Sequence, residues 1–405
     1  MHPDRARAFA GLGRLDRATA AAQSIPCKLC ATPAAPFDVV DFAKSASRQE
    51  HYPFGLSGIA VPYHRCPSCG FLFTAFFDDW SVAEFAAHVY NDDYIKVDPE
   101  YRETRPLRTA EQMVRLLDGC REARILDYGS GTGAFAAAMR AGGFARIEAY
   151  DPFSNPVRPE GRFDLITCFE VIEHTPSPVA ALAEMASLLD AGGAILFSQS
   201  LQPADIGRVR GGWWYVAPRN GHVSTFTPSA LAVLAARSGF ALYTGQGGGQ
   251  GGLHAMTAAP GRFAAAVVSQ IGKPFVHLRL LAPEGRAGAD WHAVEGTPGR
   301  RFRWTRAAAI AWEVRLPDAT PNVLRVEVPF ANEVRRNFAA ACRIELAGVA
   351  HPVAVEGGRL VATFETACAG ACSLALRTPP PMTPASLREA ATDRRELGLA
   401  IRAAP

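Results

Sequence analysis

Residues 127–133, Asp-Tyr-Gly-Ser-Gly-Thr-Gly, have the spacing in this sequence that most clearly indicates chemistry. A short apolar run precedes them, and an Ala-rich segment, 134–140, follows them. Glycines in such a turn allow positive φ angles and let a ligand approach the main chain closely. The free N–H groups at the start of a following helix point toward the same ligand. The pattern predicts a strand, a tight turn and a helix that bind a nucleotide-like cofactor through Asp127, Gly129, Gly131 and Gly133.

A second carboxylate stands where a ribose contact is expected. Asp151 follows a strand-like run, 147–150, about 20 residues after the glycine turn, and a carboxylate there accepts hydrogen bonds from ribose hydroxyls. Another strand-like run, 163–168, leads into residues 170–176, Glu-Val-Ile-Glu-His-Thr-Pro. This ordered series resembles the class I S-adenosylmethionine (SAM)-dependent methyltransferases over residues 105–258. The resemblance implies that SAM is the cofactor and that Glu170 contributes to its site.

One stretch of the sequence departs from that family. Only eleven residues separate Asp151 from Phe163, where many relatives carry a strand, a helix and an acidic residue that contacts adenine. We therefore assign no adenine-contacting residue. Phe153 is a candidate face for the adenine ring.

Four cysteines form two Cys-x-x-Cys pairs, 27–30 and 66–69, separated by 35 residues. Two thiolates at this spacing can hold one face of a tetrahedral ion, and a second pair closes the site. Because four thiolates leave no position for water, the ion would be a structural zinc that stabilises a region with little core. Disulfides, free thiols and redox catalysis are the alternatives. The predicted ligands are Cys27, Cys30, Cys66 and Cys69.

A methyltransferase preceded by this cysteine module resembles the bacterial sugar C-methyltransferases and their relatives, which carry an N-terminal zinc-binding domain. Residues 71–74 and 90–94 resemble the link between the two domains in that family, where tyrosines lie over the active site. Tyr90 and Tyr94 are thus either contacts to SAM or substrate, or packing residues of a cap helix. The resemblance implies a sugar nucleotide or a glycan of surface-polysaccharide biosynthesis as the acceptor.

Two histidines are candidate bases for methyl transfer, because the acceptor must lose a proton to become a nucleophile. His222 matches the histidine of a Glu-His pair that deprotonates a carbon acid in the sugar C-methyltransferases, but Gly221 replaces the glutamate. An oxygen nucleophile, with His222 as the base, is then comparably plausible. His174, beside Glu173, is the second candidate, and each histidine could instead have a hydrogen-bonded structural role. Residues 213–215, Trp-Trp-Tyr, form either a platform for a sugar ring or part of the core.

The order of these segments predicts the domain organisation. A disordered tail, 1–24, is followed by a zinc-binding module, 25–80. A SAM-dependent methyltransferase domain with a helical lead-in, 81–258, alternates strand-like and helix-like segments, which predicts a Rossmann-like, doubly wound α/β fold. Residues 245–252 are almost all glycine and predict a hairpin between the last two strands. Residues 259–405 carry short β-type runs separated by turns and predict an accessory antiparallel β-sandwich.

Composition restricts the possible partners. The formal net charge of this 405-residue chain is only +3, so the sequence lacks the basic character of most nucleic-acid-binding proteins. No apolar run reaches the roughly 18 residues that a membrane helix needs, and the N-terminus lacks a secretory signal core. We therefore expect a cytoplasmic protein that acts on a small molecule. The arginines of the last domain that cluster in sequence face either solvent or an anionic ligand: Arg300, Arg301, Arg303 and Arg306.

Three functional hypotheses follow. The first is SAM-dependent methyl transfer to carbon or oxygen of a sugar nucleotide or glycan. The second is a catalytically degenerate glycan-binding or scaffold protein, against which the intact glycine turn and Asp151 speak. The third is a nucleic-acid methyltransferase that docks through its zinc module, against which the low net charge speaks.

Overall fold

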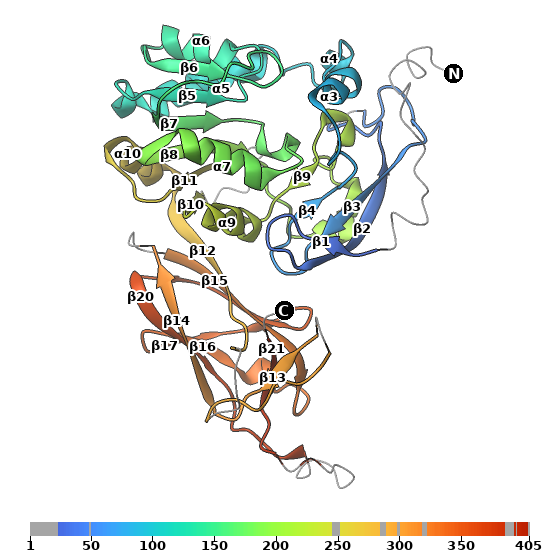
Figure 1. Cartoon of the computed structure of the whole chain (residues 1–405), viewed down its shortest axis with the longest axis vertical. Coiled ribbons are helices and arrows are strands. Elements are labelled where there is room, and N and C mark those ends of the chain that lie inside the picture. The colour runs from blue at the N-terminus through green and yellow to red at the C-terminus, as the bar shows by residue number, and fades with distance from the viewer. Residues whose placement is uncertain are drawn as a thin grey trace. The chain divides into compact units, whose positions relative to one another are not determined.

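The computed structural model describes residues 23–47, 50–244, 252–283, 289–297, 300–317, 322–384, 393 and 395–403. The chain divides into two compact units, Met1–Gly272 and Lys273–Pro405. The predicted N-terminal tail lies almost wholly outside the described residues, and so does most of the glycine-rich hairpin tip, 245–251. Figure 1 shows the elements of each unit.

The first unit is built on a mixed sheet. Its strands follow the order β10-β11-β8-β7-β5-β6, in which β8, β7, β5 and β6 are parallel and β11 is antiparallel to both of its neighbours. The strands are β5 (Ile125–Tyr128), β6 (Ile147–Tyr150), β7 (Phe163–Cys168), β8 (Leu189–Gln199), β10 (Ala241–Thr244) and β11 (Gly252–Thr257). Between β6 and β7 the described residues form no strand or helix, as their small number predicts, so β6 is the edge of the sheet.

Helices cover both faces of this sheet, as in a doubly wound fold. The helices α7 and α9 pack against each other and lie in front of the sheet in Figure 1, while Gln270 of α10 donates a hydrogen bond to the carbonyl of Leu116 at the end of α5. The helices of this unit are α3 (Val82–His88), α4 (Tyr94–Val97), α5 (Thr104–Leu116), α6 (Ala134–Ala141), α7 (Pro178–Leu188), α8 (Ile206–Val209), α9 (Pro228–Arg237) and α10 (Arg262–Ile271). Ser81 caps α3 in a reciprocal capping box with Glu84.

The cysteine segment forms a small antiparallel sheet that is completed by a distant strand. Its order is β1-β2-β3-β4-β9, and β9 follows β8, a strand of the larger sheet, by more than twenty residues. Leu72 of β4 pairs with Thr225 of β9, and Phe73 pairs with Ser224. The cysteine segment and the segment that follows β8 therefore share one sheet. Its strands are β1 (Ile25–Pro26), β2 (Pro33–Asp41), β3 (Ala60–Arg65), β4 (Leu72–Phe73) and β9 (Ser224–Thr225).

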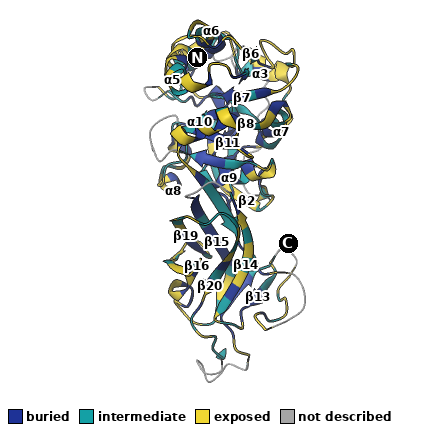
Figure 2. Ribbon diagram, turned by 90° about the vertical axis from the view of Figure 1, so that its left-hand side faces the viewer, coloured by how far each residue is buried: buried dark blue, intermediate teal, exposed yellow. Residues whose placement is uncertain are grey.

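The second unit contains two β-sheets around one apolar core. One sheet joins β12, β15, β18, β19, β21 and β13, and the other has the order β14-β20-β16-β17. Buried and exposed residues alternate along β14 and β20, as expected for strands with one face on a core (Figure 2). The strands are β12 (Lys273–Arg279), β13 (Phe302–Trp304), β14 (Ala309–Leu316), β15 (Asn322–Glu333), β16 (Arg343–Leu346), β17 (Val349–Pro352), β18 (Ala354–Val355), β19 (Arg359–Thr366), β20 (Gly370–Arg377) and β21 (Leu399–Arg402).

Two expectations for this unit need correction. The sandwich is not purely antiparallel, because β12 pairs with β15 in parallel. Arg303 is not part of a charged surface, since it is 2% exposed and donates hydrogen bonds to the carbonyls of His292 and Pro283. Its guanidinium also lies over the ring of Trp291, so Arg303 ties together loops of the core.

Candidate active site

The glycine turn between β5 and α6 has the backbone that the sequence predicts. All three glycines have positive φ angles, +75° at Gly129, +53° at Gly131 and +77° at Gly133. A Cβ at Gly129 would lie 2.4 Å from Cγ2 of Val171, in the segment after β7. The turn therefore packs so closely against the end of the neighbouring strand that a side chain at 129 has no room.

Asp151 braces this turn from the end of β6. Its Oδ2 accepts a hydrogen bond of 3.0 Å from the N–H of Gly131, and its Oδ1 accepts from the N–H groups of Phe153 and Ser154 at 2.8 and 2.9 Å. A carboxylate has about four acceptor sites, so these three bonds leave capacity on Oδ2 for one ribose hydroxyl. Phe153 is 43% exposed beside this carboxylate, where a ring could stack on it.

Asp127 is a buried carboxyl whose hydrogen bonding is incomplete. Its Oδ1 accepts a hydrogen bond of 3.3 Å from the hydroxyl of Thr167, but its Oδ2 has no partner among the described residues. Burial raises the pKa of Asp127 to about 7, and the nearby Asp151 also raises it. A buried, unpartnered carboxylate oxygen fits a cationic ligand such as SAM, which carries a sulfonium and an ammonium group.

Glu170 follows β7 with a φ of +55°, which is strained for a residue with a side chain. The hydroxyl of Ser198 accepts from its N–H and donates to its Oε1, both at 3.0 Å. Arg105 lies 3.9 Å from its Oε2 and makes a bidentate ion pair with Asp98, with N···O distances of 2.9 and 2.6 Å. Burial, and then the charge of Glu173, raises the pKa of Glu170. The sequence gives no signal for Arg105 and Asp98, because a single arginine and a single aspartate seven residues apart form no motif.

Three titratable side chains come together from the segment after β7 and the segment before β9. Glu173 and His174 end a short 3₁₀ helix, Ile172–His174, and His222 follows another, Pro218–Asn220. The N–H of Val223 donates to the backbone carbonyl of Glu173 at 2.8 Å, which joins the two segments. The side chains of Glu173, His174 and His222 each offer one donor atom, and these atoms lie within 4.8 Å of one another.

Burial determines the protonation state of this cluster. The carboxyl of Glu173 is fully buried; its Oε1 accepts a hydrogen bond of 2.6 Å from the hydroxyl of Tyr215, and burial raises its pKa to about 7. Burial lowers the pKa of His174 to about 4 and that of His222 well below its usual value. Both imidazoles are therefore neutral at pH 7, and each has one nitrogen with a free lone pair.

The backbone fixes which nitrogen of His222 carries the hydrogen. Nδ1 lies 3.0 Å from the carbonyl oxygen of Tyr215, and a carbonyl only accepts hydrogen bonds. We therefore assign the hydrogen to Nδ1, which leaves the lone pair on Nε2. The ring of Tyr215 packs 4.3 Å from that of His222, and the ring of His174 lies 4.9 Å away.

Gly221, which precedes His222, lies where the chain has little room for a side chain. Its φ is +81°, and a Cβ there would lie 3.1 Å from the hydroxyl of Tyr90 and 3.2 Å from Nδ1 of His174. A glutamate at this position would crowd both groups. Tyr90 thus lies beside His174 of this cluster, whereas Tyr94 is a buried packing residue whose hydroxyl donates to the carbonyl of Asn220 at 3.3 Å.

The Trp-Trp-Tyr segment belongs to the core rather than to an open platform. Trp213 and Tyr215 are buried, and Trp214 packs against the same cluster. Tyr215 is the residue of this segment that contacts the titratable cluster, because its hydroxyl bonds to Glu173 and its carbonyl bonds to His222.

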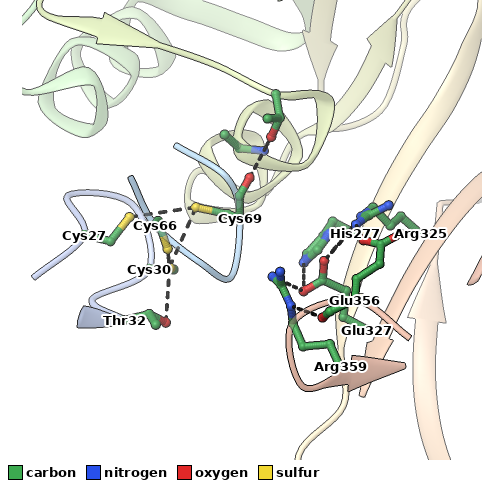
Figure 3. Close-up of polar contacts among 12 residues, drawn as sticks. Cys27, Cys30, Thr32, Cys66, Cys69, His277, Arg325, Glu327, Glu356 and Arg359 are labelled. Atoms are coloured by element: carbon green, nitrogen blue, oxygen red, sulfur yellow. Dashed lines mark hydrogen bonds and ion pairs between the residues drawn. The ribbon is translucent and has the colours of Figure 1, made fainter. Parts of the chain in front are cut away.

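The four predicted zinc ligands come together in the first unit (Figure 3). The sulfur atoms of Cys30 and Cys66 are 3.5 Å apart, those of Cys27 and Cys69 are 3.8 Å apart, and those of Cys30 and Cys69 are 3.9 Å apart. Four sulfurs bound about 2.3 Å from a tetrahedral zinc lie about 3.8 Å from one another. The donor set and its spacing therefore fit Zn²⁺.

This cysteine cluster is joined by hydrogen bonds to the start of α9 and to the segment after β7. The hydroxyl of Thr227, which caps α9, donates to the carbonyl of Cys69 at 2.6 Å. Lys28 donates to the carbonyls of Thr74 and Pro176, both at 3.0 Å, and forms an ion pair with Asp78.

Figure 3 also shows a polar cluster of the second unit, in which the buried Glu327 forms ion pairs with Arg325 and Arg359.

Comparison with known proteins agrees with this geometry. Residues 101–244 match the family model described as a methyltransferase domain. These residues form a class I SAM-dependent methyltransferase domain. The domain is 30% identical over 147 residues to the ubiquinone biosynthesis O-methyltransferase of Alkalilimnicola ehrlichii, a match that covers 30% of this chain and 59% of that relative. It is 28% identical over 151 residues to the ubiquinone biosynthesis O-methyltransferase of Azotobacter vinelandii. This second match covers 30% of this chain and 62% of that relative.

The chain therefore spans less than two thirds of the length of these curated relatives. Among solved structures, an O-methyltransferase family protein from Burkholderia thailandensis is 15% identical, with a TM-score of 0.32, and covers 42% of this chain and 63% of that chain. No helix among the described residues is long and apolar enough to cross a membrane.

Proposed function

We propose that this chain transfers the methyl group of SAM to an oxygen atom of a small-molecule acceptor. The observation that carries this proposal is the pair of buried, incompletely bonded carboxyls at the same edge of neighbouring parallel strands, with Asp127 in the last part of β5 and Glu173 beyond the end of β7. The first suits the cationic cofactor, and the second lies with two neutral histidines where an acceptor would have to lose a proton. Relatives that are O-methyltransferases support oxygen over carbon.

The residues of the chain would divide the work as follows. When bound, SAM supplies a methyl group on a sulfonium, which is a good leaving group. Asp127 and Asp151 hold the cofactor against the glycine turn, with Glu170 beside it. The Nε2 lone pair of His222 takes the proton of the acceptor hydroxyl as the oxygen attacks the methyl group. His174 and Tyr90 position the acceptor.

We propose a sugar nucleotide or glycan as the acceptor class. The cysteine module supports this proposal, because it resembles that of the sugar C-methyltransferases. In the proposed enzyme, Cys27, Cys30, Cys66 and Cys69 hold a structural zinc. By fixing β4 against β9, the zinc would also hold the segment that begins at His222.

His222→Ala tests the proposed base. It should abolish turnover while affinity for S-adenosylhomocysteine changes by only a few fold, because His222 contacts the acceptor rather than the cofactor. His254→Ala is the matched control, since His254 is also buried but belongs to β11, where its ring contacts Gln199 and Thr244. Equal turnover in wild type and His222→Ala would refute the assignment.

The acceptor is identified with a panel of sugar nucleotides, glycans and phenols incubated with SAM that carries a ¹³C-labelled methyl group. The carbon shift of the product separates a methoxy group from a C-methyl group. Labelling of a sugar hydroxyl supports the full proposal, labelling of a phenol alone contradicts the acceptor class, and a C-methyl product contradicts the oxygen nucleophile.

A further inference from the structure

One cluster has a property that acid–base catalysis does not require: the side chains of Glu173, His174 and His222 are all of types that bind metal ions. Their three donor atoms lie within 4.8 Å of one another, and the four-cysteine cluster is the other such group found among the described residues. Two imidazoles and one carboxylate form a harder donor set than four thiolates. First-row divalent cations are typically bound by such mixed nitrogen and oxygen ligands.

The donor atoms of this cluster are buried without sufficient hydrogen bonds. Glu173 Oε2 and His174 Nδ1 have no hydrogen-bond partner among the described residues. A buried polar atom without a partner costs free energy, and such atoms in a folded protein call for an explanation. A cation between these atoms would satisfy both of them.

One residue outside the set orients two of the three ligands. The hydroxyl of Tyr215 donates to Glu173 Oε1 at 2.6 Å, which leaves Oε2 for an ion. The carbonyl of the same residue lies 3.0 Å from His222 Nδ1, which leaves the Nε2 lone pair. Partners of this kind hold metal-binding histidines and carboxylates in their coordinating orientation.

The spacing of the donors is compatible with an ion after a small inward movement. Bonds of about 2.0–2.2 Å at tetrahedral or octahedral angles place neighbouring donor atoms roughly 3.0–3.5 Å apart. Side-chain rotations that move each donor atom by about 1 Å are enough to reach this spacing from 4.8 Å. Gly221 keeps the space beside His174 Nδ1 open, because any side chain at 221 would crowd it.

We propose that Glu173, His174 and His222 bind a first-row divalent cation whose open positions take two adjacent oxygen atoms of the acceptor. This inference rests on the proposed function and changes one role in it: in the loaded site His222 is a ligand rather than the base. The acceptor hydroxyl bound to the ion gives its proton to water. The oxygen then uses its electron pair to form the new C–O bond, the C–S pair stays on sulfur, and S-adenosylhomocysteine leaves. Acceptors with vicinal oxygens, such as a sugar diol or a catechol, fit this arrangement.

The test measures metal bound per chain in the zinc-loaded protein. Mn²⁺ is the probe because it prefers carboxylate and imidazole over thiolate and so leaves the cysteine site to zinc. Equilibrium dialysis followed by elemental mass spectrometry should find one zinc and one manganese per wild-type chain. Glu173→Gln and His222→Ala should each weaken manganese binding by about a hundredfold and leave the zinc content unchanged, since each removes a direct ligand.

Two controls keep the test decisive. His254→Ala removes a buried histidine outside the cluster and should retain both metals. Binding of S-adenosylhomocysteine by each variant shows that its cofactor site is folded. Absence of manganese from wild type, or equal binding in wild type and Glu173→Gln, overturns the metal proposal. If wild type binds S-adenosylhomocysteine and keeps its turnover after manganese is chelated, the metal inference is wrong and the proposed function stands. If wild type does not bind S-adenosylhomocysteine, the proposed function itself is wrong.

Discussion

Replacing Gly129 by alanine tests the packing of the glycine turn against the end of β7. Two costs add at this position. An L-residue at a φ of +75° costs about 1–2 kcal/mol relative to glycine, and a Cβ placed 2.4 Å from Val171 forces a shift that costs about 1–3 kcal/mol. Gly131→Ala is the matched control, because its φ is +53° but a Cβ there would have no neighbour within 4 Å.

The expected loss is therefore about 2–5 kcal/mol for Gly129→Ala and about 1–2 kcal/mol for Gly131→Ala. For a unit of this size, differential scanning calorimetry should show the Tm of the first unit lowered by roughly 5–15 °C and 2–6 °C, respectively. Adding Val171→Ala to Gly129→Ala removes the atoms that clash but not the strained φ. The double variant should recover about 1–3 kcal/mol relative to the sum of the single effects.

Either of two results would contradict this packing. If Gly129→Ala costs no more stability than Gly131→Ala, the turn has space beside Val171. If Val171→Ala does not relieve the effect of Gly129→Ala, the cost lies in the backbone alone.

Two other substitutions test the carboxyl of the cofactor site and the cysteine cluster. Burial raises the pKa of Asp127 to about 7, so the folded chain holds this proton more tightly than the unfolded chain, and wild type loses stability as the pH rises from about 4 to about 7. In urea titrations, the unfolding free energy of Asp127→Asn should rise relative to that of wild type by about 2–3 kcal/mol between about pH 5 and about pH 8. If the two unfolding free energies change with pH in parallel, the pKa of Asp127 is not raised. Cys66→Ser should remove the zinc and lower the Tm of the first unit by roughly 10 °C, whereas Cys372→Ser in the second unit should change neither the zinc content nor that Tm; a full zinc content in Cys66→Ser would exclude the four-thiolate site.

The sequence predicts the local parts of this site well, because they depend on neighbouring residues. The positive φ angles of the glycine turn follow from its alternating glycines, and the position of Asp151 follows from the length of one βα unit. The missing strand after Asp151 is evident from the short interval before Phe163. The two Cys-x-x-Cys pairs indicate a shared cluster through ligand chemistry alone.

The parts that the sequence does not reveal depend on contacts between distant segments. Nothing in the periodicity of residues 72–73 indicates that they pair with residues 224–225. The role of Tyr215, whose hydroxyl and carbonyl hold two members of the titratable cluster, exists only after the chain has folded. Arg303 has a charge typical of surface residues, yet backbone carbonyls and an indole ring make its burial favourable. The parallel pairing of β12 with β15 likewise has no local signal.

Calorimetric titration of the zinc-loaded chain with S-adenosylhomocysteine tests the central claim most directly. The geometry of the glycine turn, Asp127 and Asp151 predicts saturable binding of one molecule per chain. Gly129→Ala should weaken this binding at least tenfold at a temperature where the variant is still folded, since the added methyl group displaces the turn that the ligand contacts. Absence of binding to the folded wild-type chain would contradict the account.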